Sequence, residues 1–127
     1  MSKNTLKVIS DAMTELGLEY SFGRYTKKPV VYPYFVGEYQ ETEPFTEDGL
    51  QESTFLLTGF SRDTWLTLEE AKDKIVNYFN RVSGNTVITD DGSAVAVFYG
   101  HSLIVPTGDA ELQRIQINLH IKEWTVN

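Results

Sequence analysis

The sequence contains no cysteine. Disulfide bonds, thiolate metal sites and cysteine nucleophiles are therefore excluded, and the composition fits a reducing compartment. Long apolar runs are also missing: no window approaches the ~20 residues that a membrane-spanning helix needs. The N-terminal stretch "MSKNTLKVIS" carries no visible secretory signal. We therefore expect a protein without a membrane partner.

Basic residues are scarce. Eleven Lys and Arg stand against 18 Asp and Glu, which gives a formal net charge of -7. A surface that binds nucleic acid needs clustered Lys and Arg, so this balance argues against a nucleic-acid-binding protein. An acidic surplus also has a simpler role, which is to keep a protein soluble.

Motifs of catalysis are absent from the sequence. It has no phosphate-cradling glycine loop, no HExxH and no GxSxG. Its two histidines, His101 and His120, could bind a metal together with a carboxylate, but no ligand spacing supports such a site. No nucleophile is paired with a base and a group that orients it. We therefore expect a protein that is not an enzyme, with no catalytic residue, no cofactor and no metal.

What the chain does contain is enough apolar material for one core. It has 127 residues, of which 41% are hydrophobic and 13% aromatic. This length and composition predict a single domain over residues 1–127, without internal repeats.

Two segments have the periodicity of amphipathic helices. In the first, apolar residues recur at steps of three and four, and Gly17 supplies a C-terminal stop. They are Leu6, Ile9, Ala12, Met13 and Leu16. In the second, Thr67 and Glu70 have the spacing of a capping box, with Leu66 placed to staple onto Ala71. Its apolar stripe is Leu68, Ala71, Ile75 and Phe79, and residues 83–85 are expected to end it.

The rest of the chain favours β-structure. Residues 20–26 and 30–36 predict a hairpin, and Pro33 makes the second of these runs an edge strand or a bulge. Residues 53–60 resemble a central strand, and residues 86–89 begin a second hairpin that turns at residues 90–92. The last run alternates, with Ile115, Ile117, Leu119 and Ile121 on one face. The predicted fold class is α+β, with a mainly antiparallel sheet, two helices packed on one face and a long acidic loop.

The acidic loop, "VGEYQETEPFTEDGLQES" at residues 36–53, is the most unusual stretch. It holds a third of the acidic residues and no Lys or Arg. The carboxylates are Glu38, Glu41, Glu43, Glu47, Asp48 and Glu52. Tyr39 and Phe45 lie in a stretch too polar to bury them, so they either pack locally or anchor a partner. We expect the loop to be mobile in the free protein and to become ordered on assembly.

Five motifs spread over about a third of the chain form one pattern. They are Tyr32-Pro33-Tyr34, the acidic connection from Glu38 to Gln51, Glu52-Ser53-Thr54-Phe55, Gly59-Phe60 with Trp65, and Leu68-Glu69-Glu70-Ala71-Lys72. This pattern resembles that of a known family, the tail terminators or tail-to-head joining proteins of long-tailed siphophages and related prophages. The element order extends the resemblance over most of the chain.

This resemblance implies a structural role in a bacteriophage virion. Such proteins form a hexameric ring on the finished tail tube, which stops tube growth and joins the tail to the head connector. The implied partners are further copies of the chain, the tail tube protein and the head connector protein. DNA would pass through the lumen without specific binding. The implied location is the head–tail interface, after assembly in the cytoplasm of the bacterial host.

Two groups of residues are the candidates for these contacts. An acidic lumen would repel DNA phosphates, so the partner-facing or lumen-facing candidates are Glu38, Tyr39, Glu41, Glu43, Phe45, Glu47 and Asp48. A ring buries edge surface between copies, so the subunit-interface candidates are Tyr32, Tyr34 and Phe35. The alternatives left open are another head–tail connector, a tail-tube-like subunit, or a small cytosolic ligand-binding α+β protein.

Overall fold

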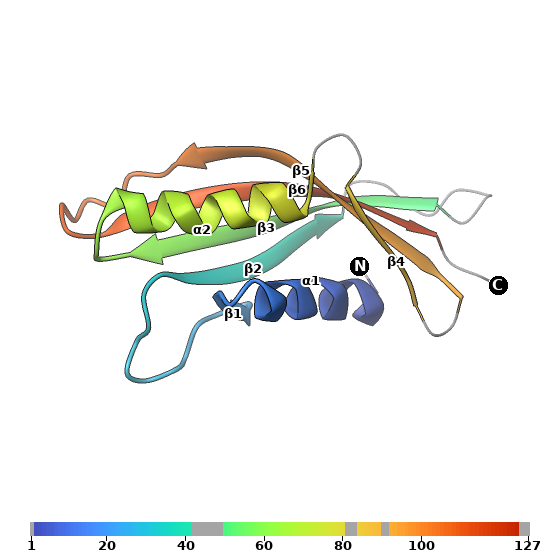
Figure 1. Ribbon diagram of the computed structural model, residues 1–127, viewed down its shortest axis with the longest axis horizontal. Coiled ribbons are helices and arrows are strands. Elements are labelled where there is room, and N and C mark those ends of the chain that lie inside the picture. Colours follow the sequence, from blue (N-terminus) through green and yellow to red (C-terminus); the bar gives the residue numbers. More distant parts are fainter. Residues whose placement is uncertain (1, 42–49, 81–83, 90–91, 125–127) are drawn as a thin grey trace.

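The computed structural model describes residues 2–41, 50–80, 84–89 and 92–124. Two helices and six strands follow one another as α1 (Lys3–Glu15), β1 (Glu19–Phe22), β2 (Tyr34–Glu41), β3 (Leu50–Ser61), α2 (Trp65–Tyr78), β4 (Asn85–Ile88), β5 (Ala94–Ile104) and β6 (Gln113–Trp124) (Figure 1). The strands form one sheet in the order β1-β2-β3-β6-β5-β4. All neighbouring strands are antiparallel except β1 and β2. The predicted α+β class is confirmed.

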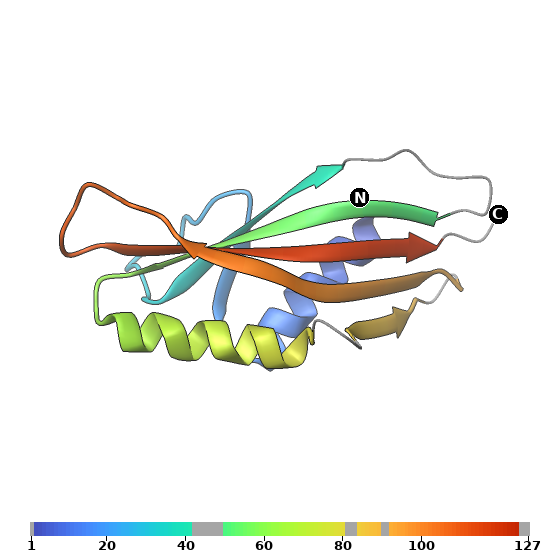
Figure 2. The same cartoon turned by 90° about the horizontal axis from the view of Figure 1, so that it is seen from above.

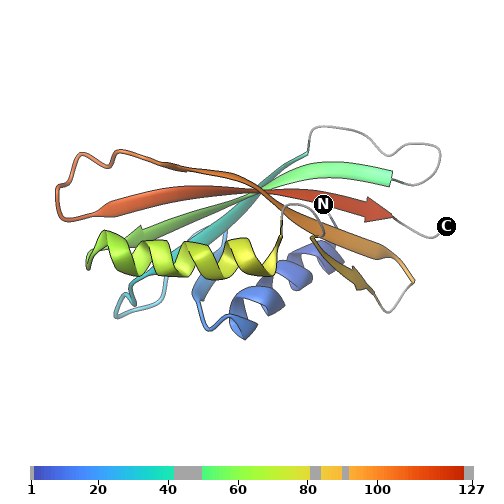
Figure 3. The same ribbon diagram turned by 45° about the horizontal axis from the view of Figure 1, so that its top comes forward.

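Both helices lie on the same face of the sheet, and within the described residues no helix lies on the opposite face (Figures 2 and 3). Along β3 and β6, buried residues alternate with half-exposed ones, as the two-residue period of a strand requires. The buried face of β6 consists of the predicted residues Ile115, Ile117, Leu119 and Ile121. The core therefore lies between this face and the two helices. In the part of the chain that the structure describes, neither helix is long and apolar enough to cross a membrane.

Helix α1 matches its prediction. Ser2 is the N-cap, and its hydroxyl accepts a hydrogen bond from the backbone N–H of Thr5 at 3.2 Å. At the other end Gly17 has a φ of +72°, a left-handed conformation that glycine adopts without a Cβ penalty. Ile9, Ala12 and Met13 are buried against the sheet.

Helix α2 has the predicted buried stripe but different ends. Leu68, Ala71, Ile75 and Phe79 are all buried. The predicted N-cap at Thr67 is wrong, because Thr64 is the N-cap and accepts from the N–H of Thr67 at 3.3 Å.

The predicted hydrophobic staple and the predicted C-terminus of α2 are also wrong. Because the helix begins at Trp65, Leu66 lies in its first turn, where it is 67% exposed and staples nothing. The helix ends at Tyr78 rather than at residues 83–85, and Phe79 is the C-cap residue. The ring of Phe79, directly after the last helical residue, is buried in the core.

The predicted hairpin of residues 20–26 and 30–36 is wrong. The strands in this region are β1 and β2, and they pair in parallel, with Tyr20 opposite Phe35. A parallel pair cannot be joined by a tight turn, and residues 23–33 make the longer connection. Consequently residues 34–37 of β2 do not form an edge, because they lie between β1 and β3, whereas in the described part of the chain residues 38–41 pair with β3 alone.

Much of the predicted acidic loop is β-strand. Residues 36–41 belong to β2 and residues 50–53 to β3, and these two strands pair as an antiparallel hairpin. The connection is therefore much shorter than residues 36–53. Glu43, Phe45, Glu47 and Asp48 lie outside the described residues, so the expected mobility of the loop stays a prediction.

Candidate functional site

The face of the sheet opposite the helices, called here the uncovered face, is mainly polar. Every second residue of the two central strands points to it. From β3 these are Leu50, Glu52, Thr54, Leu56, Thr58 and Phe60, and from β6 they are Arg114, Gln116, Asn118, His120, Lys122 and Trp124. Five of these twelve residues carry a hydroxyl, amide or imidazole group, four are apolar and three are charged, with Glu52 as the one carboxylate. The uncovered face can thus form hydrogen bonds without carrying a dense charge of either sign.

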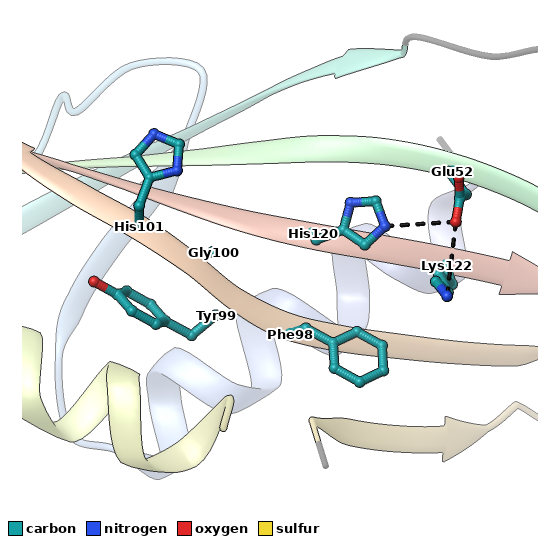
Figure 4. Close-up of a pocket in the computed structure, with 7 residues that line it drawn as sticks. All are labelled: Glu52, Phe98, Tyr99, Gly100, His101, His120 and Lys122. Atoms are coloured by element: carbon teal, nitrogen blue, oxygen red, sulfur yellow. Dashed lines mark ion pairs between the residues drawn. The ribbon is translucent and has the colours of Figure 1, made fainter. Parts of the chain in front are cut away.

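An open groove of about 590 Å³ crosses the uncovered face (Figure 4). It is lined by Glu52, Phe98, Tyr99, Gly100, His101, His120 and Lys122. Oε1 of Glu52 lies 3.6 Å from Nε2 of His120 and 3.7 Å from Nζ of Lys122. These three side chains are all partly exposed, so their mutual attraction contributes little to stability and their polar atoms remain accessible.

A bulge in β5 places His101 on the uncovered face. The register shifts between Tyr99, which pairs with Leu119, and His101, which pairs with Asn118. Gly100 is the extra residue, and a Cβ there would lie 2.9 Å from the carbonyl oxygen of Asn118. Figure 4 shows the rings of Tyr99 and His101 pointing in opposite directions. The bulge therefore re-aims the strand, and a glycine inside a strand was the signal for it in the sequence.

The chemistry available to the groove is limited. His120 and Glu52 form an imidazole–carboxylate pair, and Nε2 of His101 lies 2.5 Å from Nδ2 of Asn118. Within the described residues, no group of three or more His, Cys, Asp or Glu is placed to hold a metal ion. The groove can offer hydrogen bonds and a cation, Lys122, to a polar ligand or to a passing polyanion.

Aromatic rings stack at one end of the uncovered face. The ring centroids of Tyr25 and Tyr34 are 4.2 Å apart, and those of Tyr34 and Phe60 are 5.1 Å apart. Tyr32 lies beside Tyr34, with a centroid distance of 5.6 Å. Burial chiefly raises the pKa of Tyr34, and the neighbouring Tyr32 and Tyr25 add to the effect. We refer to these four residues as the aromatic stack.

The three predicted interface residues have different surroundings. Tyr32 is 36% exposed and Tyr34 is half-buried in the aromatic stack. Phe35 is fully buried in the core, so its side chain is not available to a second subunit and its prediction as an interface residue is wrong.

The predicted acidic and aromatic candidates are divided between the two faces of the sheet. Glu38 pairs with Leu56 on the uncovered face, whereas Tyr39 and Glu41 pair with Phe55 and Ser53 on the helix side. Tyr39 is 41% exposed. Its ring stacks on Phe22 with centroids 6.0 Å apart, which is the local packing considered above. Where the structure describes them, these residues do not form one surface.

A buried carboxylate was missed by the sequence analysis. Glu123 is 2% exposed and accepts hydrogen bonds from the hydroxyls of Ser2 and Thr5 at the start of α1. The signal was present, because Glu123 continues the alternation of buried residues that runs from Ile115 to Ile121. This carboxylate ties the two ends of the described chain together.

Comparison with known proteins gives a fold but no family. No protein-family model and no curated protein matches the sequence. Among solved structures, the fold is similar to that of a chain in the virion of a native gene transfer agent particle. The TM-score is 0.67, and the match covers 90% of this chain and 84% of that chain. The two sequences are 10% identical, so the likeness is one of fold.

Proposed function

We propose that this chain is a structural protein of a phage-type virion, and that it forms a ring at the end of the tail tube. The observation that carries the proposal is the fold similarity to a virion chain over 90% of this protein. The tail-terminator motifs of the sequence support the narrower role independently. In this role the ring stops tube growth and joins the tail to the head connector. The chain acts by assembly and not as an enzyme.

The layered fold supports a definite orientation in such a ring. A helix with its side chains is about 10–12 Å across, so α1 and α2 would narrow a channel if they faced its axis. The uncovered face leaves more space because neither of the two described helices lies on it (Figures 2 and 3). We therefore place the uncovered face toward the lumen and the helices outside.

The chemistry of the uncovered face suits DNA passage. Neutral side chains such as Thr58, Gln116 and Asn118 dominate the central strands, and they neither hold nor strongly repel phosphates. Glu38 and Glu52 add negative charge, whereas Lys122 and Arg114 add positive charge. This mixture replaces the strongly acidic lumen expected from the sequence with a weakly charged one. DNA would slide past it without specific binding.

Electron microscopy of the purified protein and of assembled tails tests the ring. We expect closed rings with a fixed number of subunits, which is six if the resemblance to tail terminators holds. We also expect a cap of this protein at one end of the tail. Open-ended tubes would identify a tail-tube-like subunit instead. A strictly monomeric protein that also fails to bind tail tubes would contradict the proposal, and binding to the head alone would favour another connector.

The groove supports a second candidate, a small-molecule-binding protein. Its favouring observation is the convergence of His120, Lys122 and Glu52 on one open groove. Such a protein would lose its ligand when Lys122 is changed to Ala, and it would remain a monomer. Ring formation that is unaffected by Lys122→Ala favours the virion role.

A further inference from the structure

Two opposite edges of the sheet lack a strand partner within the described part of the chain. At one side, β1 is the last strand and pairs only with residues 34–37 of β2, and residues 38–41 of β2 have β3 as their one strand neighbour among the described residues. At the other side, β4 pairs with residues 94–97 of β5, so residues 101–104 of β5 have β6 as their one strand neighbour. Each edge therefore presents a short run of strand backbone to a possible partner.

Both edges carry exposed apolar side chains. Phe22 at the end of β1 is 47% exposed, and Leu103 and Ile104 at the end of β5 are 45% and 61% exposed. Solvent-facing edges are usually protected by Lys, Pro or a very short strand. Both runs are only four residues long, which limits uncontrolled pairing, but residues 19–22 and 101–104 contain neither Lys nor Pro. Contact with another strand would remove these side chains from water.

The connections beside the two edges carry opposite charge. Residues 23–33, between β1 and β2, contain Arg24, Lys27 and Lys28 and no acidic residue. Residues 105–112, between β5 and β6, contain Asp109 and Glu111 and no basic residue. All five side chains are exposed, but Lys27 pairs with Glu19 and Asp109 pairs with Arg62 within the chain. The complementarity between copies therefore depends on Arg24 and Lys28 against Glu111. Figure 1 shows both connections at the same end of the sheet, so a sideways shift of one copy brings the basic connection beside the acidic one.

We propose that a second copy of this chain docks on these edges, with β1 of one copy pairing with residues 101–104 of the next. This joint rests on the ring function proposed above and describes its subunit contact. The contact is head-to-tail, because each copy offers its β1 edge to one neighbour and its β5 edge to the other. Such contacts give a closed ring when the rotation between neighbouring copies closes, and an open filament when it does not. It assigns the edge strand of the contact to β1 instead of residues 30–36, while Tyr32 remains in the basic connection beside the joint.

The direction of the joint follows from the sheet. Strand β1 is parallel to β2, and the alternation through β3, β6 and β5 makes β5 antiparallel to β1. When the ring axis runs along the strands, the rotation that relates neighbouring copies leaves the direction of each strand unchanged. The pairing between copies is therefore antiparallel, like that of most strands within the sheet.

The register of the sheet predicts which side chains meet. Residues at one height on the uncovered face follow the pairs Ser21–Val36, Val36–Thr58, Thr58–Gln116 and Gln116–Leu103. Ser21 and Leu103 thus stand at the same height on opposite sides of the sheet. In the joint, Ser21 of one copy lies beside Leu103 of the next. A tilt of the strands shifts the partner by two residues, to His101, because a one-residue shift would exchange the faces.

Introduced cysteines test the joint directly, because the natural chain has none. Ser21→Cys protein is mixed with Leu103→Cys or with His101→Cys protein and then oxidised. Cross-strand neighbours on one face have Cβ atoms about 4.5–5.5 Å apart, which is near disulfide distance. We expect disulfide-linked pairs of unlike chains with at least one of these two partners.

The matched control is Ile104→Cys, which lies on the opposite face of the same edge. Ser21→Cys is expected to link several-fold more with its best same-face partner than with this control. Equal yields, or yields dominated by Ser21→Cys with itself, would overturn the proposed joint.

Charge reversal tests the complementarity of the connections. Lys28→Glu alone, or Glu111→Lys alone, is expected to weaken self-association several-fold in sedimentation experiments at low salt. The double variant restores the opposite signs with the charges exchanged, so its association should return toward that of the natural chain. A double variant that associates more weakly than both single variants would contradict the pairing of these connections.

The outcomes separate this joint from the ring function. Closed rings without a link from Ser21→Cys to either same-face partner overturn the joint and leave the ring function in place. Linked pairs that never close into rings, alone or on tail tubes, keep the edge contact and overturn the ring function.

Discussion

Glu123 of β6 accepts a hydrogen bond from the backbone N–H of Ser2 at 3.1 Å and another from the Ser2 hydroxyl at 2.5 Å. The same oxygen accepts from the hydroxyl of Thr5. Ser2 is the N-cap of α1, where unpaired backbone N–H groups and the helix dipole favour a negative charge. The last strand thus holds the first helix by its N-terminus.

Replacing Glu123 with Ala should destabilise the fold. The change leaves buried donors without their acceptor, which costs about 1–3 kcal/mol. Chemical denaturation gives the free energy of unfolding, and Asp73→Ala at an exposed position of α2 serves as the control. Glu123→Gln keeps an oxygen that can accept, so it should cost less than Glu123→Ala. An unchanged denaturation midpoint for Glu123→Ala would show that the contact contributes nothing.

Ile75 should be a major contributor to stability. Its side chain is fully buried on the inner face of α2, so Ile75→Ala removes packing and leaves a cavity that costs about 2–5 kcal/mol. Leu66→Ala on the same helix is the control, because Leu66 is 67% exposed. The two midpoints are compared in urea, and similar small losses at both positions would mean that the helix does not use this face.

Gly59 should resist enlargement. A Cβ at this position would lie 2.5 Å from Cε1 of Phe35, whose ring is fully buried. Gly59→Ala therefore forces the ring or the strand to move, at about 1–3 kcal/mol. Thr58→Ala, on the uncovered face of the same strand, is the control. Thermal denaturation that ranks Gly59→Ala as the milder change would refute the close contact.

Alkaline pH should weaken the fold through Tyr20. Burial raises the pKa of Tyr20 to about 12, above the ~10 of an unfolded chain. The folded state holds this proton more tightly, so its stabilising effect is complete below pH ~10 and is lost as the pH rises toward ~12.

Tyr20→Phe isolates this loss from the titration of other groups. Between pH 9 and pH 12, the natural protein should lose about 1–2 kcal/mol more than the variant, after allowance for the partial exposure of Tyr20. Denaturation curves at the two pH values measure the difference. Parallel losses in the two proteins would exclude Tyr20 as the source.

The two carboxylates of the acidic stretch on the uncovered face should act on DNA. Changing both Glu38 and Glu52 to Gln removes negative charge from the proposed lumen, so DNA should be retained longer while tail attachment is unchanged. Glu41→Gln is the control, because Glu41 pairs with Ser53 on the helix side. Ejection rate and the fraction of tailed particles are the two measurements. A loss of attachment in the double variant would instead assign these residues to docking.

Local periodicity made several elements predictable. The stripe from Leu68 to Phe79 marks one face of a helix, and the alternation from Ile115 to Ile121 marks one face of a strand. Both patterns depend on residues close in sequence. The N-cap of α2 was harder to predict, because Thr64 and Thr67 both offer a hydroxyl that could cap a helix, and the structure uses Thr64.

The candidate site was less predictable, because its residues come from separate strands. The groove joins Glu52 of β3, His120 and Lys122 of β6, and the bulged end of β5. Neither His101 nor His120 had a partner at a recognisable spacing. Glu38 and Glu41 are close in sequence, yet they lie on opposite faces because one is an even and the other an odd position of β2.

The sequence by itself determined the α+β class, both helical faces and the buried face of β6, since hydrophobic side chains repeat with the period of the element that buries them. Only the tertiary structure decided that β1 runs parallel to β2, that Phe35 is enclosed in the core, and that the open edges belong to β1 and the end of β5. Strand pairing joins residues far apart in the chain, and its direction and order depend on which surfaces the whole fold can bury.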